Sequence, residues 1–95
     1  MGRYWGIIEQ RSVTDAVAEA HAVYSRFHDL YDALTWRLSR DPLPDEAVEI
    51  APEFFLVKSE AWSYDGFCQI SMVYMLDRDN QQIVIEELWV AAVAA

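Results

Sequence analysis

The first half of the chain carries a long helical pattern. Residues 13–40 include neither Gly nor Pro, and their apolar side chains recur at alternating intervals of four and three, which places them on one face of an α-helix. This stripe comprises Val13, Val17, Ala20, Tyr24, Phe27, Tyr31, Leu34 and Leu38. A straight helix of this length would span about 42 Å, longer than a compact domain of this size. We therefore expect a long bent helix or a helical hairpin, with the break near Tyr24–Ser25 or His28–Asp29.

Strand patterns flank this helical segment. Short runs of aromatic and β-branched residues predict strands, one before the helix at residues 4–10 and three after it at 54–62, 67–76 and 83–90. Turn residues at 64–66 (Tyr-Asp-Gly) and 77–80 (Asp-Arg-Asp-Asn) join the last three strands, so we expect an antiparallel meander. Asp41-Pro42-Leu43-Pro44 ends the helix, and the residues from there to Pro52 are predicted to form an acidic connector.

Together these elements predict one α+β domain over residues 1–95, in the order strand, one or two helices, then three strands. The helix is expected to begin at Ser12–Asp15, where hydroxyl and acidic side chains suit a helix N-terminus. Its apolar stripe should pack on the sheet face that carries Ile70, Met72 and Tyr74. The opposite face is predicted to be polar and concave, with Lys58, Glu60, Gln69 and Ser71.

Composition and charge restrict the class of partner. Hydrophobic residues make up 54% of the chain, and 16 acidic residues against 7 Lys and Arg give a formal charge of −9. The negative electrostatic field of such a chain disfavours binding to nucleic acid and to anionic lipid. The acidic groupings at 41–49 and 86–87 serve either to solvate the domain or to meet a basic partner. No apolar run suits a membrane span or a secretory signal, and a single cysteine favours a cytoplasmic location.

Candidate chemistry is sparse. His21 and His28 are seven residues apart, about 10 Å along a straight helix, and zinc needs three or four converging ligands, so we expect no metal; a local His28–Asp32 hydrogen bond is expected instead. Cys68 lies among apolar residues, which favours an inert thiol. The three glycines are not clustered, so no phosphate-binding loop and no cofactor are expected.

Three segments of the sequence resemble segments of a known protein family. These are Leu-Ser-Arg-Asp-Pro at 38–42, Ile-Ser-Met-Val-Tyr-Met-Leu-Asp-Arg-Asp at 70–79 and Ile-Val-Ile-Glu-Glu-Leu-Trp at 83–89. With the order of elements, they resemble the RelE/ParE toxin superfamily over about residues 4–90. The resemblance implies a helical hairpin packed on a sheet. RelE-like members cut mRNA in the ribosome, ParE-like members bind DNA gyrase, and both are neutralised by an antitoxin with an extended segment.

The family's nuclease residues carry over only in part. Lys58 fits the place of a sheet lysine and Tyr74 that of a strand tyrosine, and Arg78 is a further weak candidate. At two positions where the family often has Arg, this sequence has Ser71 or Met72 and Met75 instead. The C-terminal Arg/Tyr element of the family is also missing, because only Ala and Val follow residue 90. Fixed cations are needed to stabilise a developing cyclic phosphate, so the resemblance implies a toxin-like protein without RNase activity.

The predicted role is protein–protein binding to a cognate antitoxin-like partner. The residues expected to contact this partner are Tyr24, Phe27, Tyr31, Leu34, Lys58 and Trp89. An antitoxin segment could lie between the helices and the sheet or add a strand at an edge. Two alternatives stay open: a homodimeric small-ligand-binding or scaffold domain built on the long helix, and a weak ribosome-dependent mRNA endonuclease.

Overall fold

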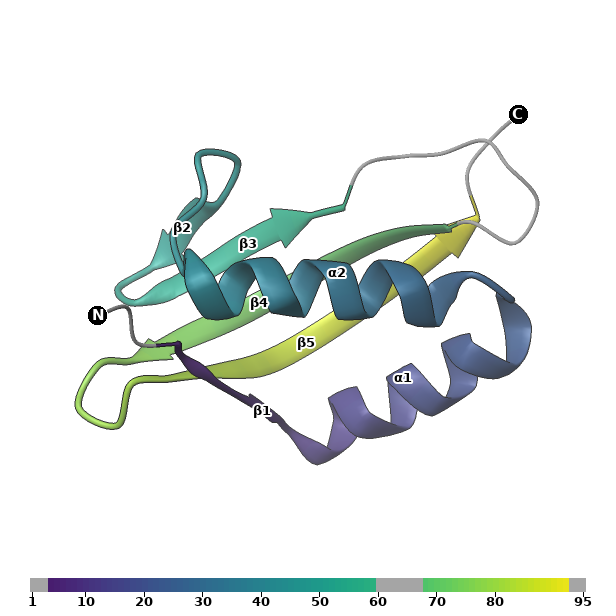
Figure 1. Ribbon diagram of the computed structural model, residues 1–95, viewed down its shortest axis with the longest axis horizontal. Helices are drawn as coiled ribbons and strands as arrows, with labels where there is room; N and C mark the ends of the chain where they lie inside the picture. The colour runs from purple at the N-terminus through teal and green to yellow at the C-terminus, as the bar shows by residue number, and fades with distance from the viewer. Residues whose placement is uncertain (1–3, 60–67, 93–95) are drawn as a thin grey trace.

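The computed structural model describes residues 4–59 and 68–92, which form a five-stranded sheet with two helices on one face (Figure 1). The elements are β1 Gly6–Glu9, α1 Arg11–Val23, α2 Phe27–Arg40, β2 Val48–Ala51, β3 Phe54–Lys58, β4 Cys68–Asp77 and β5 Gln82–Ala92. The strands lie in the order β1-β5-β4-β3-β2, with β1 parallel to β5 and all other neighbours antiparallel. The α+β class, the order of elements and the meander β3-β4-β5 are confirmed. The parallel β1 makes the sheet mixed.

The helical segment is a pair of helices, and the break falls where the sequence predicts it. Tyr24 has an extended backbone (φ −114°, ψ 114°), although its N–H still bonds the carbonyl of Ala20 at 2.8 Å. α2 begins at Phe27, whose N–H bonds the carbonyl of Tyr24 at 3.1 Å. Each helix is therefore about 20 Å long, which fits both within the 40 × 28 × 27 Å molecule.

The start of α1 differs from the prediction. Gln10, rather than a residue of Ser12–Asp15, is the N-cap, and it makes no side-chain capping bond. Its backbone carbonyl accepts from the N–H groups of Val13 (2.9 Å) and Thr14 (3.0 Å). The Thr14 hydroxyl donates to the carboxylate of Glu9 at 3.0 Å. The prediction of a hydroxyl cap was wrong because β1 runs directly into α1 and the Thr14 hydroxyl bonds the end of that strand instead.

The face of the sheet beneath the helices holds the core. The expected stripe packs there: Val13, Ala20, Phe27, Tyr31, Leu34 and Leu38 are buried, and Val17 and Tyr24 pack against them partly exposed. On β4 the covered residues are Ile70, Met72 and Tyr74, each 0% exposed, as predicted. The Tyr74 hydroxyl donates to the carbonyl of Pro42 at 2.6 Å, just beyond α2. The apolar stripe and one sheet face therefore bury each other.

A β-bulge alters which side chains of β5 face the helices. In the β4–β5 pairing, Tyr74 lies opposite Ile85 and Val73 opposite Glu87, so Glu86 is an extra residue. Because side chains alternate between faces, this insertion reverses the alternation beyond it. Leu88 therefore lies on the helix side of β5, together with Ile85.

The segment predicted as a connector contains the edge strand β2. Val48–Ala51 pairs with β3 although all four of its residues are exposed. Pro52 and Glu53 form the two-residue turn to β3, and Glu53 has φ 67°. Arg78 secures this turn, since its Nε lies 2.6 Å from the Glu53 carboxylate. The prediction of an acidic connector missed this strand, because backbone pairing rather than a buried side-chain pattern forms it.

The face of the sheet away from the helices is more apolar than predicted. Lys58, Gln69 and Ser71 do lie at one end of it, because Lys58 pairs with Ser71 and alternation places Gln69 on the same side. Register places further apolar residues on this open face, namely Ile8, Val48, Phe54, Leu56, Val73, Met75, Val84 and Trp89. The residues predicted to form a polar surface thus occupy one end of this face, and Glu87, Asp77 and Gln82 lie elsewhere on it among the apolar residues.

Several predicted features fall on residues 60–67, outside the part of the chain that the structure describes. They are the end of the strand predicted at 54–62, the position of Glu60 and the turn at 64–66. Among the described residues, neither helix has the length and apolar character that crossing a membrane requires.

Candidate functional site

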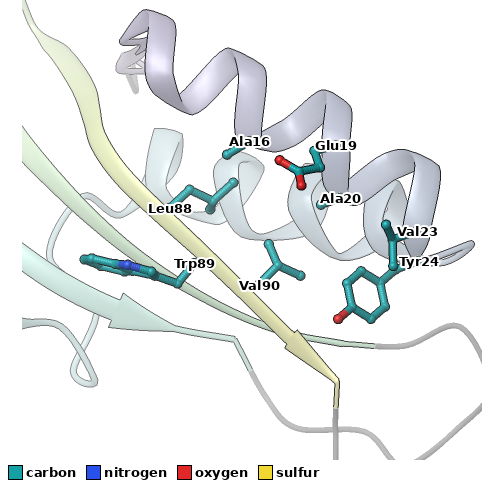
Figure 2. Close-up of a pocket in the computed structure, with 8 residues that line it drawn as sticks. All are labelled: Ala16, Glu19, Ala20, Val23, Tyr24, Leu88, Trp89 and Val90. Carbon is teal, nitrogen blue, oxygen red and sulfur yellow. The ribbon is translucent and has the colours of Figure 1, made fainter.

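A groove runs between α1 and β5 (Figure 2). Its volume is about 370 Å³, and it is open to solvent along one side. The residues that line it are Ala16, Glu19, Ala20, Val23, Tyr24, Leu88, Trp89 and Val90. A second hollow of about 220 Å³, lined by Ser12, Glu87, Leu88 and Trp89, lies further along β5. The two share Leu88 and Trp89, so together they follow the outer side of β5.

Small residues and the β-bulge explain why the groove exists. Ala16 and Ala20 face β5 from successive turns of α1, and their short side chains leave the space unfilled (Figure 2). Leu88 and Val90 project toward α1 from the strand, while the Trp89 ring points away from α1 (Figure 2). Without the extra residue at Glu86, alternation would instead bring Glu87 and Trp89 to the helix side.

The rim of the groove is acidic. Glu19 is an exposed residue of α1 that lines the groove, and Glu87 is an exposed residue of β5 that lines the neighbouring hollow. Glu86 accepts a hydrogen bond from the Gln10 side chain at 3.2 Å. In a chain of formal charge −9, these carboxylates make the outer side of β5 attractive to a cation and unfavourable for an anionic ligand.

The predicted partner-binding residues divide into two groups. Phe27 is 0% exposed, and Tyr31 and Leu34 are also buried in the core. Since these three side chains pack inside the chain, they are not available to a partner in this fold. Tyr24 and Trp89 both line the groove.

Lys58 lies on the other face of the sheet, where the register Lys58–Ser71–Trp89 forms one row across three strands. Trp89 is 51% exposed in this row. The exposed members of the predicted set thus occur beside the groove and at the adjoining end of the open face, with Trp89 common to both.

The candidate catalytic residues do not converge. Lys58 lies at one end of the open face, whereas Arg78 lies beyond the opposite end of β4 in an ion pair with Glu53. About seven residues of strand separate these two positions, roughly 20 Å. Tyr74 is on the helix-covered face, where burial raises the pKa of its hydroxyl, with a smaller effect of Asp41. The geometry brings no two of them together.

The histidines and the cysteine do not form a site. His28 Nε2 lies 3.0 Å from the Asp32 carboxylate, as predicted. The break between the helices brings the rings of His21 and His28 to 5.5 Å between centroids, closer than the straight-helix expectation of about 10 Å. The described residues nevertheless include no group of three or more His, Cys, Asp or Glu that could hold a metal. Burial raises the pKa of the Cys68 thiol, which lowers its reactivity.

Sequence reasoning missed most of the groove. Ala16, Glu19, Val23, Leu88 and Val90 were not among the predicted contact residues, although all line it. Ala16 and Ala20, one turn apart on the helical segment, were a usable signal, because small residues at successive turns mark where a helix leaves space. The bulge gave no signal in the sequence.

Comparison of the chain with protein-family models, with curated proteins and with solved structures finds no match.

Proposed function

We propose that this chain is the toxin-like half of a toxin–antitoxin pair and that it acts by binding another protein. The observation that carries the proposal is the acidic-rimmed groove between α1 and β5, which combines aliphatic lining with the ring of Tyr24, while the exposed ring of Trp89 lies on the other side of β5. Aromatic and aliphatic side chains in a concave site are typical of protein-binding surfaces. Apart from the added edge strand β2, the order of elements is the one that the RelE/ParE resemblance implies, and this agreement is a second argument for the proposal.

The proposal excludes RNA cleavage as the main activity. A nuclease needs cations fixed around the developing phosphate charge, and Lys58 and Arg78 lie at opposite ends of the sheet with Arg78 already paired to Glu53. Tyr74 donates its hydroxyl to a backbone carbonyl on the covered face. These positions suit a structural role for Tyr74 and Arg78.

Inducible expression in a bacterial host tests the proposal. Expression of the chain alone is expected to slow growth, and co-expression of a small protein encoded next to its gene is expected to restore growth and to yield a co-purifying complex. Mapping of mRNA 5′ ends during expression should show no new cleavage sites. Cleavage that is abolished by Lys58→Ala would instead support the nuclease alternative. Harmless expression without a binding neighbour would favour the homodimeric scaffold.

A further inference from the structure

Within residues 4–59 and 68–92, the outer edge of β5 has a strand partner along only part of its length. β1 pairs with β5 from Gly6 opposite Gln82 to Glu9 opposite Ile85. The last contact is the hydrogen bond from the Gln10 N–H to the carbonyl of Ile85, at 3.1 Å. The chain then turns into α1, and the described residues supply no strand beside residues 86–92 of β5. In the described part of the chain, this edge of the sheet is thus unpaired beyond the end of β1, and α1 runs beside it (Figure 1).

Backbone groups of Leu88 and Val90 point toward this open edge. The carbonyl of Ile70 accepts from the Ser59 N–H, so the backbone groups of Ile70 point toward β3. By alternation, those of Met72 point the same way. Because Val90 pairs with Ile70 and Leu88 with Met72, neither forms ladder hydrogen bonds with β4. Their N–H and carbonyl groups are thus directed outward, where another strand could bond them.

Side chains on the two sides of this edge specify what such a strand would carry. On the helix side, an added strand would meet the apolar groove formed by Ala16, Ala20 and Val23. On the opposite side, it would lie next to Glu87 and the exposed ring of Trp89. A carboxylate and an indole both attract a cationic side chain, by charge and by cation–π contact.

From these observations we propose that β5 accepts an extended segment of a second protein in which apolar residues alternate with Lys or Arg. The segment adds a strand to the open edge, with its apolar residues in the groove and its cations against Glu87 and Trp89. This inference rests on the proposed protein-binding function and names the chemistry of the partner. A second copy of this chain is a poor occupant, because it would bring Glu86 and Glu87 of two acidic chains together.

Binding of synthetic heptapeptides to the full-length protein tests the inference. The probe alternates Val and Lys and has blocked ends, and the comparison peptide has Glu in place of Lys. The Val–Lys peptide is expected to bind at least about tenfold more tightly and to slow hydrogen exchange at the amides of Leu88 and Val90. Equal affinity for the two peptides, or absence of binding, would overturn the proposal.

Two matched pairs of variants test the backbone and charge components. Val90→Pro removes an outward N–H and should weaken binding about tenfold relative to Val90→Ala, which keeps it. Glu87→Lys should weaken binding relative to Asp79→Lys, which changes the net charge equally at the far β4–β5 turn. A probe with N-methyl groups at alternate residues repeats the backbone test without altering the protein. Affinities unaffected by these changes would place the peptide elsewhere and reject the proposal.

The outcomes separate this inference from the proposed function. If a neighbouring gene product neutralises the chain but binds Val90→Pro and Glu87→Lys normally, the toxin–antitoxin role stands and strand addition at β5 is wrong. If the peptide binds as described while expression is harmless, the binding site stands and the toxin role fails. A dimer in sedimentation that Val90→Pro dissociates would show that a second copy occupies the edge and would overturn the inference.

Discussion

The two faces of the sheet are made by the same strands yet differ sharply in exposure. Beneath the helices, Ile70, Met72 and Tyr74 are each 0% exposed. On the other face, Val73 of the central strand β4 is 8% exposed, whereas Ile8 and Val48 of the two edge strands are 40% and 58% exposed. Both faces are largely apolar. The difference therefore comes from helix coverage and from distance to the sheet edge rather than from the hydropathy of the strands.

This contrast shows why alternation alone is an incomplete guide to burial. β4 carries Met72 on the covered face and Val73 and Met75 on the open face, so its sequence is apolar on both sides. A strand of this kind is typical of sheets in which both faces are packed. The difference in coverage between the two faces arises because the apolar stripe of the helices packs on one of them.

The largest predicted effect separates two methionines of β4. Met72→Ala should lower the free energy of unfolding by about 2–5 kcal/mol, because a fully buried side chain leaves a cavity. Met75→Ala, on the open face of the same strand, should cost about 1 kcal/mol, since part of its side chain is already in contact with water. Urea unfolding of both variants measures the difference. Equal losses would contradict the proposed asymmetry of the faces.

Alkaline pH should destabilise the covered face selectively. Burial raises the pKa of Tyr31, with a further contribution from its hydrogen bond to Glu9, and burial likewise raises the pKa of Tyr74. The unfolded chain loses these protons near pH 10, whereas the folded protein retains them. The stabilising effect is thus complete below pH 10 and is lost as the pH rises above that value.

Unfolding in urea between pH 8 and pH 11 measures this dependence. Tyr31→Phe and Tyr74→Phe should each flatten the decline above pH 10. Tyr4→Phe is the control, because Tyr4 is 64% exposed. An unchanged slope in both core variants would show that these hydroxyls are not held in the protonated form by the fold.

At neutral pH, a smaller effect should distinguish a core hydroxyl from a surface hydroxyl. Tyr74→Phe keeps the buried ring but removes the donor to the Pro42 carbonyl. A net loss of about 0.5–1.5 kcal/mol is expected, the usual contribution of one hydrogen bond. Tyr4→Phe should cost less than about 0.5 kcal/mol, because its ring contact with Arg40 is retained. Thermal or urea unfolding under one set of conditions compares the two.

The sequence predicted those parts of the fold that depend on buried side chains. Phe27, Leu34 and Leu38 recur at helical spacing and all reach the core, because burial selects for that periodicity. A bend or break was predicted from length, since a straight helix would extend beyond its own core, and of the two places suggested, Tyr24–Ser25 and His28–Asp29, the structure has the first. β2 was missed because its backbone pairs with β3 while its side chains stay in solvent.

The site was less predictable because it depends on register. The extra residue at Glu86 decides that Leu88, rather than Glu87, turns toward α1. No residue type marks that bulge, and without it the residues of β5 beyond Ile85 would exchange sides. The open edge of β5 likewise follows from the point at which β1 ends, after Glu9. Such features arise from pairing between distant segments, which local patterns do not encode.

The smallest predicted effect belongs to the outermost strand of the open face. Val48→Thr keeps the β-branched shape and places a hydroxyl in solvent, so the free energy of unfolding should change by less than about 0.5 kcal/mol. Val57→Thr makes the same exchange at a residue that is 1% exposed. There the hydroxyl must be buried, and a loss of about 1–3 kcal/mol is expected. A substantial loss for Val48→Thr in urea unfolding would mean that other parts of the chain cover Val48, so that the two faces differ less than described.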